Sequence, residues 1–225
     1  MNNNINENIC RYKVTTQRKN FHRKSTAFRK DALIRSTLDL IASKGIHATT
    51  VRAIAMHANV TPGLIRHYFL TKEDLILVAY EYYMDTILNA VRESLESLQN
   101  STARSRLAMF VMASLTAPVV DPDSIAVWST FMNRVRYDEK IRSIRESKYY
   151  DFRNQLEVLI KDAKVQSGGS TESEQIKRLA MASTAVINGL WQEGCALPDA
   201  FAPGEISEIG LQAISAIVGI CLTKE

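Results

Sequence analysis

Residues 50–69 of the 225-residue chain, TVRAIAMHANVTPGLIRHYF, carry the pattern that most restricts the fold. Two helical stretches of about eight residues are separated by a break of about three or four residues. Asn59 stands in the break, where the backbone is expected to be left-handed, a conformation that asparagine tolerates best after glycine. Pro62 follows at the first position of the second stretch, where its missing N–H costs no hydrogen bond. Two short helices that meet at a tight turn are therefore predicted.

This arrangement has the geometry of a helix-turn-helix, whose second helix enters the major groove of DNA. The residues expected to hold the two helices together are Ile54, Ala55, Ala58, Val60, Leu64, Tyr68 and Phe69. The residues expected to contact DNA bases or phosphates are Thr50, Arg52, Thr61, Pro62, Gly63, Arg66, His67, Tyr68 and Lys72. Arg66 is suited to a guanine edge or a phosphate, and Lys72 to a phosphate. The alternative is an ordinary helical hairpin within a bundle.

Helical patterns separated by short breakers fill the chain on both sides of this segment. The expected helices span about residues 25–44, 71–98, 102–117, 122–137, 139–165, 171–195 and 204–222. Capping boxes are predicted at Thr71 and Thr171. Because no alternating β-branched segment is bounded by turn residues, the predicted fold is all-α. We expect a basic disordered tail (1–25), a three-helix DNA-binding head (26–72) and a larger helical body for ligand binding and dimerisation (73–225).

Charge is distributed unevenly along the chain. Residues 1–72 hold 13 Lys and Arg against 3 Asp and Glu, a net +10, and the remainder holds 15 against 21, a net −6. A basic front on an acidic body indicates a nucleic-acid-binding module. Eight of the 13 cations precede Asp31, so a basic tail alone is an alternative explanation. That tail would either follow phosphates on the operator or add only nonspecific, salt-sensitive affinity.

Several other classes of protein are disfavoured. Cys10, Cys195 and Cys221 lie too far apart to suggest a disulfide framework or a zinc site. The longest apolar stretch, 108–120, is too short to cross a membrane and contains Pro118. The first residues resemble no signal peptide, so a cytoplasmic location is expected. None of the four histidines lies in a catalytic or metal-binding motif. We therefore expect no catalytic residue, metal or cofactor.

Residues 45–76, GIHATTVRAIAMHANVTPGLIRHYFLTKEDLI, resemble the N-terminal signature of TetR-type transcriptional regulators. The matching positions are Gly45, Thr49, Thr50, Val51, Ile54, Ala55, Ala58, Val60, Gly63, Tyr68, Phe69, Lys72, Glu73 and Leu75. Asn59 departs from the usual turn glycine, and Ile46 stands where an aromatic residue is common. The resemblance implies a homodimer that binds a palindromic double-stranded DNA operator, usually as a repressor. It also implies a small-molecule effector that binds the body and shifts the recognition helices out of register.

Shorter stretches, at 67–69, 128–134, 137–141 and 186–194, are similar to repressors of the choline-to-glycine-betaine pathway. This similarity implies choline or a related quaternary ammonium, which aromatic side chains can hold by cation–π contact. The residues expected to line the ligand site are Tyr83, Met109, Phe110, Trp128, Phe131, Met132, Asn188 and Trp191. The alternative is that they are simply core. An acidic side chain among them would favour a cation, whereas a buried Arg134 or Arg136 would favour an anion.

The last two expected helices carry small residues on repeated turns: Ala180, Ala182, Ser183, Ala185, Gly189, Ala213, Ser215, Ala216 and Gly219. Small side chains permit close approach, so a homodimer is expected in which each subunit contributes these two helices; packing within one subunit is the alternative. Two functions remain open: a ligand-controlled repressor, or a DNA-dependent adaptor whose body binds a protein partner. A deep, partly apolar cavity would favour the first, and an exposed apolar patch over a filled core the second.

Overall fold

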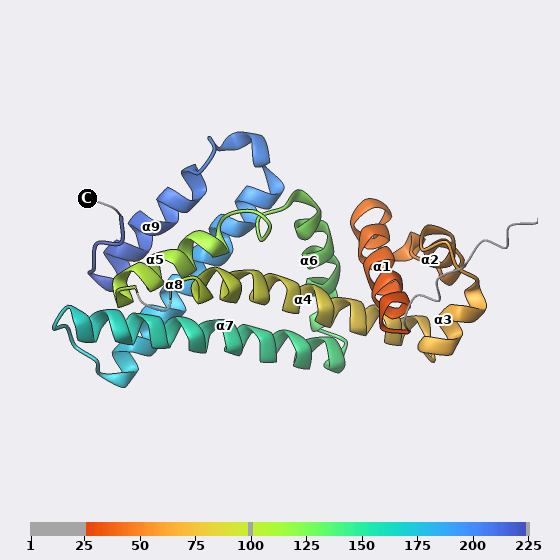
Figure 1. Cartoon of the computed structure of the whole chain (residues 1–225), viewed down its shortest axis with the longest axis horizontal. Coiled ribbons are helices and arrows are strands. Elements are labelled where there is room, and N and C mark those ends of the chain that lie inside the picture. Colours follow the sequence, from red (N-terminus) through yellow and green to blue (C-terminus); the bar gives the residue numbers. More distant parts are fainter. Residues whose placement is uncertain (1–25, 99–100, 224–225) are drawn as a thin grey trace, which may run out of the picture.

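The computed structural model describes residues 26–98 and 101–223 and confirms the all-α class (Figure 1). These two ranges contain no strand. The helices are α1 (Thr26–Ala48), α2 (Val51–His57), α3 (Pro62–Tyr68), α4 (Lys72–Glu96), α5 (Ala103–Ser114), α6 (Pro122–Val135), α7 (Glu139–Gln166), α8 (Ser173–Ala196), a 3₁₀ turn (Pro198–Ala200) and α9 (Glu205–Val218). The tail predicted for residues 1–25 lies outside the described residues. Within the described ranges, no helix is both long and apolar enough to cross a membrane.

Helices α1, α2 and α3 form a small head at one end of the molecule (Figure 1). Asn59 adopts a left-handed backbone with φ 52°, as predicted, and this conformation turns the chain from α2 into α3. Gly45, with φ 75°, bends the end of α1, which continues to Ala48 beyond the predicted end. The core of the head consists of Leu33, Ile34, Leu40, Ile54, Ala55, Ile65, Phe69, Leu75 and Ala79.

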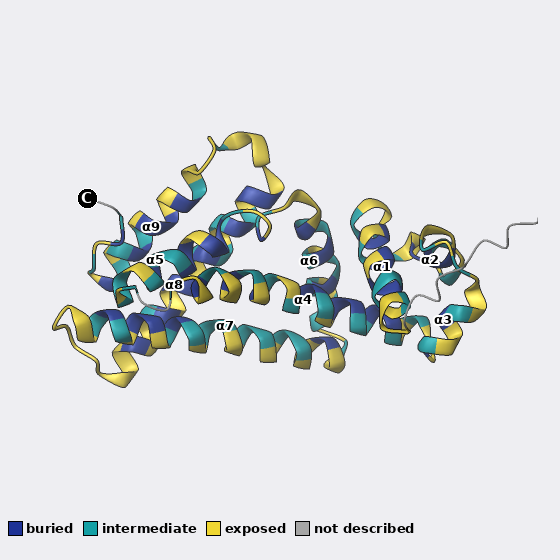
Figure 2. Ribbon diagram, viewed as in Figure 1, coloured by how far each residue is buried: buried dark blue, intermediate teal, exposed yellow. Residues whose placement is uncertain are grey.

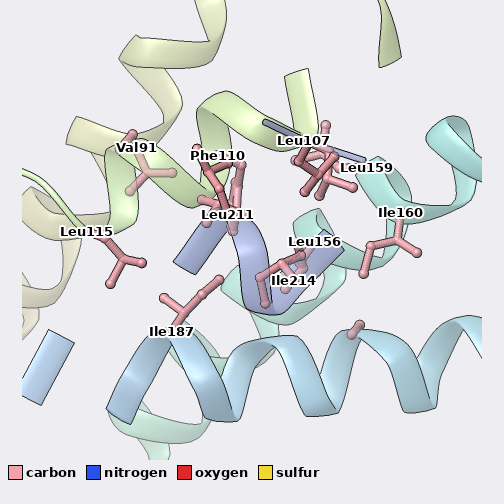
Figure 3. Packing of buried hydrophobic residues seen from close by; sticks show 14 of the residues in the cluster. Val91, Leu107, Phe110, Leu115, Leu156, Leu159, Ile160, Ile187, Leu211 and Ile214 are labelled. Atoms are coloured by element: carbon pink, nitrogen blue, oxygen red, sulfur yellow. The ribbon is translucent and has the colours of Figure 1, made fainter. Parts of the chain in front are cut away.

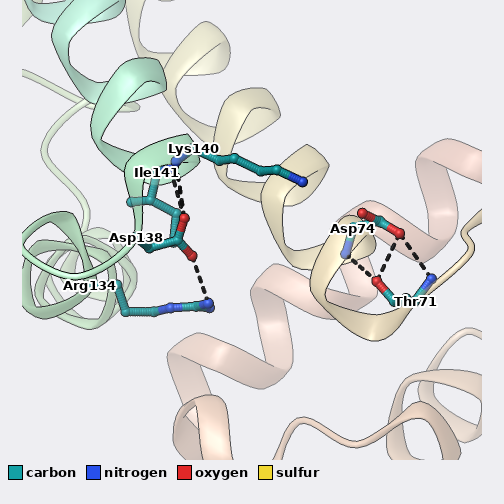
Figure 4. Close-up of polar contacts among 6 residues, drawn as sticks. All are labelled: Thr71, Asp74, Arg134, Asp138, Lys140 and Ile141. Carbon is teal, nitrogen blue, oxygen red and sulfur yellow. Dashed lines mark hydrogen bonds and ion pairs between the residues drawn. The ribbon is translucent and has the colours of Figure 1, made fainter.

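Helix α4 is shared between head and body. It starts at the predicted capping box, where the Thr71 hydroxyl accepts a hydrogen bond from the Asp74 amide and the Asp74 carboxylate accepts one from the Thr71 amide, both 3.0 Å long (Figure 4). Leu75 and Ala79 complete the head core, whereas Val91 and Leu95 belong to the body core. The boundary predicted at residues 72 and 73 therefore falls at the start of a helix that runs through both cores.

Five helices, α4, α5, α7, α8 and α9, enclose the core of the body (Figure 3). The most buried side chains of α5 belong to this core. Helices α5 and α9 approach closely because Gly210 has no side chain: a Cβ there would lie 2.3 Å from the Leu115 Cδ1 atom. The principal members of this core are Val91, Leu107, Phe110, Val111, Leu156, Ile160, Ile187, Leu211 and Ile214. Full burial of one such side chain stabilises the fold by roughly 1.5–3 kcal/mol.

A third group, the junction cluster, joins the head to the body. Its members are Ile41, Ile76, Tyr80, Tyr83, Met84, Val127, Phe131 and Ile141, from α1, α4, α6 and α7. The Tyr80 and Phe131 rings stack with their centroids 4.1 Å apart. The Tyr80 hydroxyl is buried and finds no hydrogen-bond partner among the described residues. Burial raises the pKa of Tyr80 to about 12, partly opposed by the charge of Arg145.

The capping box predicted at Thr171 is wrong. Helix α8 begins at Ser173, and its N-cap is Glu172, whose carboxylate accepts hydrogen bonds from the amides of Glu174 (3.1 Å) and Gln175 (2.8 Å). Asp138 caps α7 in a comparable way and also pairs with Arg134 at 3.0 Å (Figure 4). The predicted helix over 204–222 is shorter than expected, because Gly219 takes a left-handed conformation and ends α9 at Val218.

Candidate DNA interface and ligand cavity

One side of α3 is exposed on the surface of the head. Its exposed residues, here called the reading face, are Thr61, Pro62, Gly63, Arg66 and His67. The opposite side is anchored by Ile65, which is 2% exposed, and by the buried Phe69 that follows the helix. Ile65 was not among the predicted anchors. Leu64 and Tyr68, both predicted anchors, are half-buried.

Two residues of the reading face, Arg66 and Gly63, have no evident role in stabilising the fold. Arg66 makes no hydrogen bond or ion pair with any residue that the structure describes. A Cβ at Gly63 would meet only the Thr61 Oγ1 atom, at 3.9 Å, so the fold itself does not require glycine there. Glycine in a helix costs about 1 kcal/mol relative to alanine. A surface without a side chain at this point permits close approach by a DNA backbone.

Positively charged residues precede and follow the reading face in sequence. Residues 40–72 include no Asp or Glu. Arg52 is exposed on α2, and Lys72 is half-buried at the start of α4. The Thr50 hydroxyl caps α2 by accepting a hydrogen bond from the Ala53 amide (3.1 Å), so it also holds the helix that supports α3. The predicted DNA-contacting residues thus lie on α2, on α3 and at the start of α4, with a positive local charge.

A cavity of about 100 Å³ lies within the body. Its aromatic walls are Tyr83, Trp128, Tyr149, Phe152 and Trp191, from α4, α6, α7 and α8. The Trp191 indole donates a hydrogen bond to the Val119 carbonyl (2.8 Å), and its ring meets that of Trp128 edge to face, with centroids 6.1 Å apart. The Tyr83 hydroxyl donates to the Ser124 carbonyl (3.1 Å), and burial raises the pKa of Tyr83. The two hydrogen bonds fix the Trp191 and Tyr83 rings, and Trp128 packs against the first of them.

The polar groups of the cavity are cationic or neutral. Arg145 and Lys148 line it from α7, and Asn188 and Gln192 from α8. The Lys148 ammonium pairs with the Asp85 carboxylate at 2.7 Å. The Arg145 guanidinium lies over the Tyr149 ring, 5.5 Å from its centroid. Among the described residues, no Asp or Glu lines the cavity.

Four of the eight residues predicted to bind ligand line this cavity: Tyr83, Trp128, Asn188 and Trp191. The other four do not. Phe110 is packed in the body core with its ring 4.8 Å from that of Phe152, and Phe131 is in the junction cluster. Met109 packs against the body core, and Met132 is half-buried on α6.

The cavity-lining residues that sequence reasoning missed include Arg145, Lys148, Tyr149 and Phe152. All four lie on α7, whose sequence is rich in charged residues and gives the pattern of a solvated helix. Arg134 and Arg136, named as markers of an anion site, lie elsewhere. Arg134 pairs with Asp138, and Arg136 is exposed beside Tyr137.

The small residues of α8 divide into two sets. Ala180 and Ser183 are buried within the subunit, whereas Ala182, Ala185 and Gly189 form an exposed row. A Cβ at Gly189 would meet no atom within 4 Å. Exposed residues also follow the outer side of α9 (Figure 2), Ile209 among them. Part of the predicted stripe thus packs internally and part remains open on the surface.

Comparison with known proteins gives matches along most of the chain. A family model for bacterial regulatory proteins of the tetR family matches residues 33–79, and one for the C-terminal part of BetI-type transcriptional repressors matches residues 103–219. The HTH-type transcriptional regulator BetI of Pseudomonas aeruginosa (strain LESB58) is 24% identical over 189 residues, covering 80% of this chain and 88% of the relative. The same regulator of Rhizobium meliloti (strain 1021) is 26% identical, covering 72% and 76%.

Solved structures show the same architecture. A transcriptional regulator from Pseudomonas aeruginosa PAO1 superposes with a TM-score of 0.78 at 26% identity, covering 90% of this chain and 96% of the other. A transcriptional regulator from Saccharomonospora viridis in complex with choline has a TM-score of 0.70 at 21% identity, covering 84% and 96%. At that identity, the second likeness concerns the fold.

Proposed function

Because the chain belongs to the TetR family of transcriptional regulators, with a C-terminal domain of the BetI type, we propose that it is a homodimeric repressor released from a palindromic operator by a small molecule. The observation that carries the proposal is the reading face. It presents Gly63 and an Arg66 that pairs with none of the described residues, on a helix whose other side is anchored by Ile65. Helix α4 joins this head to the helices around the cavity.

A dimer follows from the size of the recognition helix. Helix α3 has 7 residues, so one copy reads few base pairs. Two copies on adjacent half-sites, about 34–36 Å apart, double the contacts and match a palindromic operator. The exposed row of Ala182, Ala185 and Gly189 offers a surface on which two subunits can approach closely.

The cavity favours a small-molecule effector over a protein partner. Its aromatic lining and convergent polar groups are typical of ligand sites. About 100 Å³ is smaller than the roughly 300–1,000 Å³ of sites for drug-sized ligands, which favours a small ligand. Choline is the quaternary ammonium to test, because aromatic walls attract such groups and a structural relative binds it.

Fluorescence anisotropy tests the DNA-binding part of this proposal. Labelled fragments from upstream of the protein's own gene and its neighbours are titrated at two salt concentrations, with and without choline. We expect tight binding to a subset of fragments, with an affinity that falls as salt rises. Release by choline would identify the effector class. Selective binding that choline does not change would support the repressor and exclude choline as its effector. Equal binding to all fragments would contradict the prediction that one of them contains an operator.

Gly189→Arg is expected to produce a folded monomer with weakened operator binding. The protomer has room for a side chain at this position, but a long cation would hold two subunits apart. Sedimentation velocity reports the oligomeric state, and anisotropy reports operator affinity. Gly189→Ala is the matched control, since it extends the row of Ala182 and Ala185 and should remain dimeric. A dimeric Gly189→Arg variant with unchanged affinity would place the subunit interface elsewhere.

A further inference from the structure

The charge of the cavity wall is unbalanced. Arg145 and Lys148 are both on the cavity, and Lys148 has its counter-ion in Asp85 at 2.7 Å. Arg145 forms no ion pair with any acidic residue in the described ranges, and its guanidinium lies over the Tyr149 ring. One guanidinium thus borders a small aromatic cavity without a neutralising partner. A charged group in such surroundings is stable when a ligand or water satisfies it.

The geometry of guanidinium favours one kind of ligand group. Its planar array of N–H donors matches the two oxygens of a carboxylate, and charge-assisted bonds of this kind are about twice as strong as neutral ones. The amides of Asn188 and Gln192 supply further donors on α8. The rings of Trp128, Trp191 and Phe152 supply apolar walls for the rest of the molecule. A quaternary ammonium would meet the attraction of the rings and the repulsion of Arg145 together.

We infer that the effector is a small anion with an apolar body, in the simplest case a carboxylate, held by the Arg145 guanidinium and enclosed by the aromatic walls. This inference rests on the proposed function, because it names the chemical class of the molecule that controls DNA binding. It also predicts that choline binds weakly despite the aromatic lining. Lys148, neutralised by Asp85, contributes little to the choice between anion and cation.

The chain provides its own probe for the test. It contains two tryptophans, Trp128 and Trp191, and both line the cavity, so intrinsic tryptophan fluorescence reports on this site alone. Three compounds with the same ring and different charge are titrated into the full-length protein: phenylacetate, phenylacetamide and 2-phenylethylammonium, with choline alongside. We expect phenylacetate to bind roughly 10-fold or more tightly than the amide, and both cations to bind most weakly.

Variants identify the group responsible. Arg145→Gln should weaken phenylacetate binding by about 10-fold or more with little change for phenylacetamide, and Arg145→Lys should retain part of the preference. Arg178→Gln, an exposed arginine elsewhere on α8, is the matched control and should leave all affinities unchanged. Circular dichroism confirms that each variant is folded. An unchanged order of affinities in Arg145→Gln would overturn the assignment.

A second measurement does not depend on the shape of a ligand. Iodide and caesium have similar electronic structures and opposite charges, and both quench tryptophan fluorescence. We expect iodide to quench the half-buried Trp128 more than caesium does, and the difference to shrink in Arg145→Gln. An unchanged ratio of iodide to caesium quenching in Arg145→Gln would overturn the anion site, whether or not a phenyl compound binds.

The outcomes separate this inference from the proposed function. If no fragment is bound selectively but phenylacetate binding depends on Arg145, the repressor proposal fails and the anion site stands. If the operator is bound and choline releases it while phenylacetate does not, the repressor proposal stands and the anion class is wrong.

Discussion

Arg66→Ala is expected to abolish sequence-selective binding to the operator while the protein remains a folded dimer. Arg66 is exposed on the reading face and forms no hydrogen bond or ion pair with a described residue, so its removal leaves the core of the head intact. A bidentate arginine contact to a base contributes about 1–3 kcal/mol, and a dimer loses two such contacts. The combined loss of about 2–6 kcal/mol corresponds to an affinity lower by roughly 30-fold to more than 10⁴-fold.

Anisotropy titration at one fixed salt concentration measures this loss, and circular dichroism and sedimentation confirm the folded dimer. Arg106→Ala removes the same charge from α5 in the body, where Arg106 lies 3.9 Å from Asp162, and serves as the matched control. A uniform, modest weakening on all DNA sequences would indicate a phosphate contact instead of base recognition. Wild-type affinity and base preference in Arg66→Ala would mean that α3 is not the recognition helix.

Phe131→Ala is expected to lower the free energy of unfolding by about 3–5 kcal/mol. The Phe131 ring is fully buried in the junction cluster and stacks on Tyr80 with centroids 4.1 Å apart. Its removal leaves a cavity where α4, α6 and α7 meet, and α1 packs against this cluster through Ile41. Urea denaturation followed by circular dichroism gives the change in free energy, at a protein concentration held constant because the proposed dimerisation would contribute to stability.

Tyr80→Phe is the control for this substitution because it keeps the stacked ring and removes the hydroxyl. The buried Tyr80 hydroxyl has no partner among the described residues, so its loss should leave the stability unchanged or raise it by about 1 kcal/mol. A loss from Phe131→Ala below about 1 kcal/mol would show that the junction can collapse around the missing ring.

Local signals in the sequence predicted the head well. The left-handed Asn59, the start of α3 at Pro62 and the capping box at Thr71 each depend on a few neighbouring residues, and the structure confirms all three. The prediction at Thr171 failed for an equally local reason. Glu172, one residue later, reaches two amides of the first turn and takes the capping position.

The cavity was only half predictable, because helical spacing shows which residues share a face but not which neighbour that face meets. Phe131 and Trp128 lie on one helix, yet the first packs on Tyr80 and the second borders the cavity. Arg145 and Lys148 gave no signal, since cations on a charged helix are usually solvated. The place of Arg145 and Lys148 on the cavity depends on how α7 packs against α4 and α8.

The continuity of α4 gives the molecule a lever arm. Tyr83 and Leu88 border the cavity, while Leu75 and Ala79 sit in the head core on the same 25-residue helix. From Leu88 to Lys72 the helix spans about 24 Å, so a tilt of about 5° at the cavity would displace the far end by about 2 Å. The same displacement in two subunits related by a two-fold axis would change the distance between the two recognition helices by up to about 4 Å, whereas the half-sites stay about 34 Å apart. A rotation too small to disturb either core would therefore misalign both helices with the operator.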